Sequence, residues 1–213
     1  MQCIRPMRHM DAERVAELHH AAMGKSLWAR LGRRFLTELY RGLVESPLFL
    51  GFVYVEEGSI RGFIAGSTDA SRMMSELFRR RFPVLGGAAA LGLLRRPGAL
   101  VPLLQTARYF QASQDEELSV PAESLFCSFE PKLRGRRVSG HINKVLFDDL
   151  LARGQRYVKV TTEVDNEGAN RQLSSWGFER RGEFDFYGKR MVRFVLDLAE
   201  SDRVAAVSRH PSV

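Results

Sequence analysis

Apolar and polar residues between positions 123 and 198 follow two different periods, which predict strands and helices in a fixed order. Apolar residues recur at helical spacing from Val138 to Leu150, and Gly154 follows where a helix is expected to stop. Residues 157–164 alternate instead, as in a strand with one buried face. The predicted elements are a strand at 125–129, a helix from 138 to 154, a strand at 157–164, a short helix ending at Gly177, and a hairpin of strands at 178–186 and 189–198.

The first 66 residues predict one strand, two helices and a hairpin. Asp11 and Ser26 each precede apolar residues at helical spacing, as helix-capping residues do. Glu57-Gly58-Ser59 has the composition of a hairpin turn. The predicted elements are a strand at 3–5, helices that begin at Asp11 and Ser26, and strands at 49–56 and 60–66.

A basic, glycine-containing turn lies between the strand at 125–129 and the helix that follows it. Lys132, Arg134, Arg136 and Arg137 all fall in this turn. The first turn of a helix has backbone NH groups without intrahelical partners and the positive end of the helix dipole, so it attracts anions. The turn therefore predicts a site for a phosphate-bearing molecule, although a solvated basic helix cap has the same composition.

The turn resembles a signature of the GNAT superfamily of acyl-CoA-dependent N-acyltransferases. That signature, Arg/Gln-x-x-Gly-x-Gly/Ala, is similar to the stretch from Arg134 to Ser139, with Arg137 in place of the central glycine. Arg137 is expected to narrow the room for a pyrophosphate or to force the backbone into a different pose.

A second GNAT signature, Asn-x-x-Ala-x-x-x-Tyr-x-x-x-Gly-Phe, is similar to the stretch from Asn166 to Phe178. Asn166, Ala169, Gly177 and Phe178 are at the expected spacing, and Leu173 stands where the family has its tyrosine. The order of elements over nearly the whole chain fits the same family.

The resemblance implies an α+β fold of the sandwich type, with a mixed, mostly antiparallel central sheet, helices on both faces and a helical insert. It also implies acetyl-CoA (coenzyme A) as co-substrate, with its pantetheine arm paired to the edge of a strand where two neighbours part. The acceptor wall would include Trp28, Arg30, Arg33, Arg34 and Tyr40. The residues to which the resemblance and the turn assign cofactor binding are Phe126, Cys127, Ser128, Phe129, Arg134, Gly135, Arg136, Arg137, Val138, Ser139, Gly140, Asn166, Ala169 and Asn170.

The implied reaction is N-acetyl transfer from acetyl-CoA to an amine of a small-molecule acceptor, by direct attack in a ternary complex. Glu123, at the start of the cofactor strand, is the acid best placed to accept the amine proton, and a solvated strand-end glutamate is the alternative. Leu173 cannot protonate the leaving thiolate, so Ser174 is the predicted donor, with Ser175, Tyr187 or a water as alternatives. The absence of the tyrosine leaves a second function open, an acyl-CoA-binding regulatory module with little or no turnover.

Length and composition favour one soluble domain. At 213 residues with 45% hydrophobic side chains, we expect a single domain at 1–198 and a polar tail at 199–213 that frays. Charged residues interrupt the first apolar stretch, which predicts a cytoplasmic protein without a secretory signal. Cys3 and Cys127 predict no disulfide framework, and Cys127 fits a small core residue better than a nucleophile. The five histidines show no metal-ligand spacing, so we assign no metal.

Residues 71–110 form a basic insert with seven arginines against Glu76 as its one acid. Its apolar part is too short to cross a bilayer and predicts two or three short helices, broken at Pro83, Gly86-Gly87 and Pro97-Gly98. We favour a lid over an anionic acceptor, because the insert leaves from the strand beside the cofactor strand and returns directly to it. A helix on an acidic membrane surface, an oligomer contact and a solvated helical cap are the alternatives.

The pI of about 9.8 also raises nucleic-acid binding as a function. No zinc finger, basic zipper or aromatic RNA-binding motif occurs in the sequence, so nucleic acid is not an expected partner. A small-molecule amine is the expected partner, and the charge of the insert favours one that bears phosphate or carboxylate. The resemblance adds a homodimer paired through the C-terminal strands as one form of assembly.

Overall fold

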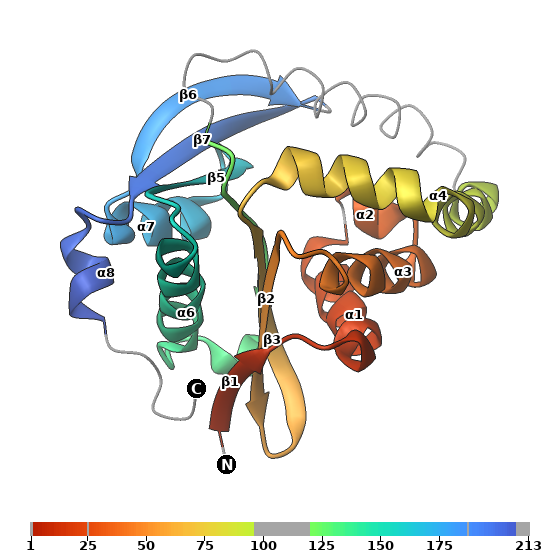
Figure 1. Ribbon diagram of the computed structural model, residues 1–213, viewed down its shortest axis with the longest axis horizontal. Coiled ribbons are helices and arrows are strands. Elements are labelled where there is room, and N and C mark those ends of the chain that lie inside the picture. Colours follow the sequence, from red (N-terminus) through yellow and green to blue (C-terminus); the bar gives the residue numbers. More distant parts are fainter. Residues whose placement is uncertain (1, 25, 96–119, 187, 208–213) are drawn as a thin grey trace.

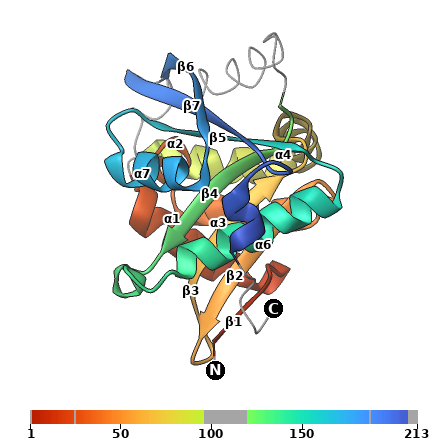
Figure 2. The ribbon, with the colours of Figure 1, turned by 90° about the vertical axis from the view of Figure 1, so that its left-hand side faces the viewer.

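The computed structural model describes residues 2–24, 26–95, 120–186 and 188–207. In this part of the chain, a twisted sheet separates two groups of helices (Figures 1 and 2). The strands are β1 (Gln2–Pro6), β2 (Phe49–Glu56), β3 (Ser59–Ser67), β4 (Glu123–Phe129), β5 (Tyr157–Glu163), β6 (Glu179–Phe186) and β7 (Lys189–Asp197). The helices are α1 (Ala12–Met23), α2 (Leu27–Arg30), α3 (Arg33–Val44), α4 (Ala70–Arg95), α6 (Val138–Ala152), α7 (Glu167–Trp176) and α8 (Asp202–Ala206), with short 3₁₀ helices η1 (His9–Asp11) and η3 (Pro131–Leu133).

The sheet has seven strands in the order β1-β2-β3-β4-β5-β7-β6. Each neighbouring pair is antiparallel except β4 and β5, which are parallel and are connected through α6. The predicted fold class, a mostly antiparallel sheet with helices on both faces and a helical insert, is confirmed. The predicted hairpins β2–β3 and β6–β7 are also confirmed.

Two hydrophobic cores form, one on each face of the sheet. The first lies under α1, α3 and α4, and the second lies under α6, α7 and α8. Successive residues of β2 feed opposite cores, with Val53 in the first and Phe52 in the second, as the period of a strand requires. Trp28 and Tyr40, expected in the acceptor wall, are buried in the first core instead. Both rings find aromatic partners there, because Trp28 stacks on Phe35 and Tyr40 meets Phe63 edge-on.

Two predicted helix boundaries were wrong. The helix expected from Ser26 is divided into α2 and α3 at Gly32, whose φ of 94° no helix can contain. In the insert, the break expected at Pro83 is present as a kink at Arg81, whose φ of −109° and ψ of 19° separate two helical segments of α4, because Pro83 removes a backbone hydrogen bond and crowds the preceding turn. Gly86-Gly87 does not break α4, because the neighbouring residues Leu85, Ala88 and Ala89 pack into the first core. The break expected at Pro97-Gly98 lies outside the described residues.

The segment expected to fray after residue 199 begins with an ordered helix, α8. The Ser201 hydroxyl oxygen accepts a hydrogen bond from the backbone NH of Val204 at 3.3 Å, which caps the helix. Val204 is buried in the second core, and the Arg203 guanidinium lies over the Trp176 ring. Residues 201–206 therefore pack against the domain. The polar composition of this segment did not indicate that packing.

His19 on α1 is fully buried among aromatic rings, and this placement predicts acid sensitivity. Its Nδ1 lies 2.7 Å from the Tyr40 hydroxyl, and its ring is 4.8 Å from that of Phe126. Burial, with a smaller effect of His20, lowers the pKa of His19 from 6.5 to about 4. The unfolded chain therefore takes up this proton at a higher pH than the native protein does, so the stability conferred by a neutral His19 is present above pH 6.5 and is lost as the pH falls toward 4.

We expect the free energy of unfolding to fall by about 3 kcal/mol from this residue alone between those limits. The measurement is urea unfolding from pH 7.5 to pH 4.5. The variant His19→Gln is expected to be less stable at pH 7.5 and to lose this part of the pH dependence. An equally steep acid loss in both proteins would show that His19 is not its source.

Candidate functional site

The strands β4 and β5 part after a single paired position. In the described residues their register holds only Glu123 opposite Lys159, near the beginning of both strands. On its other side, β4 pairs with β3 along its length, except for a bulge that leaves Leu125 without an opposite residue. One edge of β4 is therefore paired, and the edge toward β5 is open beyond Glu123.

A cavity of about 1190 Å³ fills the space where the strands part. It is bounded by both diverging strands, the loop after β4, the first turns of α6 and α7, and the end of α1. Its wall, called the cavity wall below, consists of Ala21–Gly24, Ser26, Ser124–Glu130, Leu133–Gly135, Arg137–Ser139, Asn143, Val160–Glu163, Asn166, Ala169, Gln172, Leu173, Lys189 and Met191. This volume lies slightly above the range of about 300–1,000 Å³ that is typical of small-molecule sites.

The four predicted residues of β4 all lie in the cavity wall, but their side chains are held by the two cores. Phe126 packs against the first core and Phe129 against the second. The Ser128 hydroxyl donates to the Leu18 carbonyl oxygen at 3.3 Å, and burial raises the pKa of Cys127 to about 12. Cys127 is thus a protonated thiol, as expected of a core residue. What β4 offers along the gap is its backbone edge, which suits an extended ligand with amide groups.

The loop after β4 turns through two left-handed residues to reach α6. Gly135 has φ 77° and Arg137 has φ 59°. An arginine in this conformation costs about 1 kcal/mol or more relative to glycine. Arg137 thus adopts a left-handed pose that a glycine would take without this cost. Arg134, Gly135, Arg137, Val138 and Ser139 all lie in the cavity wall, at the end of α6 that attracts anions.

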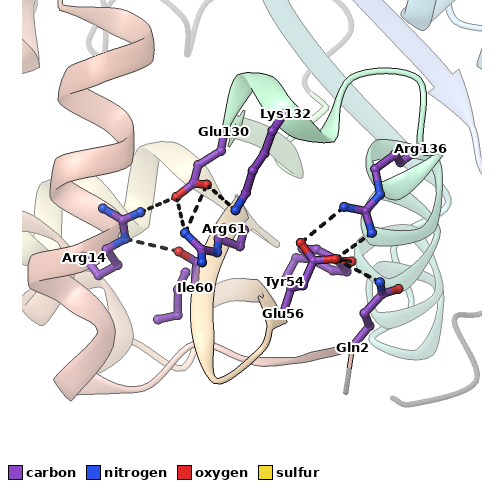
Figure 3. A network of polar contacts seen from close by, with 9 residues as sticks. All are labelled: Gln2, Arg14, Tyr54, Glu56, Ile60, Arg61, Glu130, Lys132 and Arg136. Carbon is purple, nitrogen blue, oxygen red and sulfur yellow. Dashed lines mark hydrogen bonds and ion pairs between the residues drawn. The ribbon is translucent and has the colours of Figure 1, made fainter.

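Two predicted members of this loop lie elsewhere. Gly140 is one residue beyond the cavity wall. Arg136 donates to Glu56 at the end of β2 with distances of 2.6 and 3.2 Å (Figure 3). The sequence missed Asn143, which lines the cavity one helical turn after Ser139 and donates to the Ser139 carbonyl oxygen at 2.7 Å. Spacing along α6 is the signal that could have identified it.

The start of α7 contributes the second motif. The Asn166 side chain caps this helix by accepting from the Ala169 backbone NH at 3.2 Å, and both residues lie in the cavity wall. Asn170 lies outside the wall and donates to the Val164 carbonyl oxygen at 2.8 Å, which ties α7 to the end of β5. The position of Asn170 indicates that it shapes the turn between β5 and α7.

No proton donor occupies the family's tyrosine position. Leu173 lies in the cavity wall at that position, while Ser174 is exposed and lies outside the wall. Ser175 is exposed as well and donates to the Gln172 carbonyl oxygen. Tyr187 lies outside the described residues. The sequence also missed Thr161 and Gln172, which line the cavity on β5 and α7.

Glu123 sits at the point where β4 and β5 still touch. Its side chain is 13% exposed, and a carboxylate oxygen lies 3.8 Å from Lys159 Nζ. Burial raises the pKa of Glu123, against the opposing effects of Lys159 and Arg193. Ser124, the next residue, is the first of β4 in the cavity wall. Glu123 is therefore a buried carboxylate beside the cavity rather than a solvated strand end.

Within the described ranges, no three histidine, cysteine, aspartate or glutamate side chains come together as a metal site would need. None of the helices described is both long and apolar enough to span a membrane.

Comparison with known proteins identifies the fold. No family model and no curated protein matches the chain in sequence. Among solved structures, the chain is similar to a GNAT-family acetyltransferase structure from Desulfovibrio desulfuricans, with a TM-score of 0.60 and 9% identity over 93% of this chain and 99% of that one. It is also similar to an N-acetyltransferase from Staphylococcus aureus Mu50, with a TM-score of 0.59 and 13% identity over 93% and 99% of the two chains. An acetyltransferase structure from Salmonella typhimurium, solved with its cofactor acetyl-CoA, has a TM-score of 0.59 and 13% identity over 97% and 99%.

Proposed function

We propose that this chain, which has the GNAT fold, is an N-acetyltransferase that transfers an acetyl group from acetyl-CoA to an amine of a small-molecule acceptor. The observation that carries the proposal is the parting of β4 and β5 after Glu123–Lys159, around a cavity that reaches the start of α6. The similar structure from Salmonella typhimurium, which was solved with acetyl-CoA, supports the choice of co-substrate.

Neighbouring parts of the cavity wall suit neighbouring chemical groups of coenzyme A. Backbone NH groups of Gly135, Arg137, Val138 and Ser139 and the positive end of the α6 dipole would hold the pyrophosphate, and the Arg134 and Arg137 side chains add charge. The open edge of β4 over Phe126–Phe129 would pair with the amides of the pantetheine arm. When bound, the thioester supplies an activated acyl carbon.

The chain contributes position and electrostatics to the transfer. It holds the amine and the thioester together in one cavity, which supplies the proximity term. A backbone NH on the open edge of β4 donates to the thioester oxygen as negative charge builds there. A C–N bond forms, the C–S bond breaks, the amine loses a proton and the departing thiolate gains one. A thiol with an ordinary pKa of about 8.5 leaves readily near neutral pH, so the transfer tolerates the absence of the tyrosine.

Glu123 is proposed to accept the amine proton through a water, because it lies beside the cavity wall rather than in it. We expect Glu123→Gln to lower kcat/KM about tenfold near neutral pH. Since burial raises the pKa of Glu123, the rate should rise with pH through a value above that of an ordinary glutamate, and the variant should lack this rise. Thiol release from pH 5 to 9 measures both effects. Asp197→Asn, which removes a carboxylate that is paired with Arg156 outside the cavity wall, is the matched control. Identical profiles for Glu123→Gln and the unmodified protein would remove Glu123 from the mechanism.

A second function, an acyl-CoA-binding module with little turnover, is favoured by Leu173 at the tyrosine position. Both functions require that acetyl-CoA raise the melting temperature. Only the enzyme releases free thiol when amines are supplied, so the test is thermal shift with acetyl-CoA followed by thiol release with a panel of amines that includes phosphorylated and carboxylated ones. An unchanged melting temperature at saturating acetyl-CoA would overturn both functions, and binding without thiol release from any amine would favour the second.

A further inference from the structure

The loop that leads into α6 is held at both ends by ion pairs with residues of other elements (Figure 3). At its beginning, Glu130 accepts from Arg14 on α1 at 2.5 Å and from Arg61 on β3 at 3.3 Å, and Lys132 lies 3.4 Å away. The Glu130 backbone NH also donates to the Arg61 carbonyl oxygen at 2.8 Å. This end of the loop is therefore fixed to both the first helix and the sheet.

At the other end of the loop, Arg136 is the one side chain for which the described residues show a polar contact with another element. The Arg136 guanidinium makes two hydrogen bonds to the two carboxylate oxygens of Glu56, a geometry that fixes orientation as well as distance. Glu56 is 8% exposed, and Gln2 on the neighbouring strand donates to it at 2.9 Å. The Glu56 carboxylate is thus held in place by Gln2 as well as by Arg136.

The residues on either side of Arg136 explain why this contact matters. Gly135 and Arg137 both have left-handed backbones and both line the cavity, whereas Arg136 does not. A left-handed arginine is unfavourable on its own and persists where the surroundings determine it. The Arg136–Glu56 contact therefore joins β2 to the turn that presents the NH groups of the α6 start to the cavity.

We propose that Glu56 is a positioning residue for phosphate binding: it draws Arg136 away from the cavity and thereby keeps the left-handed turn Gly135–Arg137 in its binding-competent form. The inference rests on the proposed function for its ligand, and it revises the expectation that Arg136 binds the cofactor directly. If Arg136 were a direct ligand, removal of Glu56 would release it toward the phosphates and leave binding equal or stronger. If Glu56 positions the turn, removal of either partner weakens binding to the same extent.

The test is a double-mutant cycle with Glu56→Gln, Arg136→Gln and the double variant, read by the Kd for acetyl-CoA from calorimetry. We expect each single variant to bind about tenfold more weakly and the double variant to bind no more weakly than either. Tighter or unchanged binding by Glu56→Gln, or additive losses in the double variant, would overturn the proposal. Arg156→Gln and Asp197→Asn, which break an exposed ion pair of 2.8 Å between the residue before β5 and the end of β7, are the matched controls and should leave Kd unchanged.

A second readout separates this inference from the proposed function. Amide hydrogen exchange over 135–140 in the protein without ligand should be faster in Glu56→Gln, and this holds whether or not coenzyme A is the ligand. Equal exchange in the two proteins would overturn the positioning role. Failure of the unmodified protein to bind acetyl-CoA, together with faster exchange in the variant, would overturn the proposed function and retain the positioning role.

Discussion

Ser139→Glu is expected to weaken acetyl-CoA binding strongly while slightly stabilising the fold. Ser139 lies in the first turn of α6 and in the cavity wall, so a carboxylate there would meet the pyrophosphate at the place where the helix start attracts anions. The same carboxylate is favourable for the helix itself, because an acidic residue in the first turn contributes about 0.3–1 kcal/mol through the helix dipole. Stability and binding should therefore change in opposite directions.

We expect the Kd for acetyl-CoA to rise about 100-fold or more, since a charge-assisted contact is replaced by repulsion between like charges. Calorimetry measures the Kd, and urea unfolding measures the stability. Ser139→Gln, of the same size without the charge, is the control and should lose only a small part of the affinity. Equal losses in the two variants would mean that size rather than charge is responsible, and that the phosphates lie elsewhere.

Leu173→Tyr is expected to raise turnover by supplying the proton donor that the cavity wall lacks. Leu173 stands at the family's tyrosine position, and the structure places it in the cavity wall on α7, half-buried against the second core. A general acid positioned at a leaving group contributes about 10²–10⁴-fold. Because the thiolate already leaves readily and the new side chain is not optimised, we expect a gain of about tenfold or more in kcat.

Leu173→Phe is the matched control, because it has the ring without the hydroxyl. Turnover is measured by thiol release at saturating acetyl-CoA with the best amine of the panel, and the gain should disappear above the pKa of the tyrosine. Equal kcat for the Tyr and Phe variants would show that the leaving thiolate does not lie near α7. A gain in the Phe variant alone would point to packing against the ligand rather than to acid catalysis.

Whether the sequence could place a site residue correctly depended on whether its partners lie nearby along the chain. Asn166 and Ala169 were identified through the resemblance to the second GNAT signature. In the structure they form a local unit, because the Asn166 side chain accepts from the Ala169 backbone NH at 3.2 Å. Arg136 looked equivalent to Arg134 and Arg137 along the chain. Its partner, Glu56, is 80 residues away, and no local pattern indicates that contact.

The same distinction applies to the core. Tyr40 was expected in the acceptor wall, but its hydrogen bond to His19 and the burial of both residues beside Phe126 depend on the way α1 and α3 meet β4. Gly86-Gly87 has the composition of a helix break, and α4 continues through it because packing of the flanking residues outweighs a propensity of about 1 kcal/mol per glycine.

By itself, the sequence determined the order of the strands and of helices α1, α6 and α7, the two hairpins and the helix start rich in arginine, because periodicity, turn residues and caps act over a few positions. The tertiary structure alone decided that β4 and β5 meet only at Glu123 and Lys159 and that the cavity opens beyond them. It also decided that Arg136 is held by Glu56 and that Ser174 lies outside the cavity wall. These features depend on strand divergence and on contacts between distant segments, whose free energy is set by packing of the whole domain rather than by neighbouring residues.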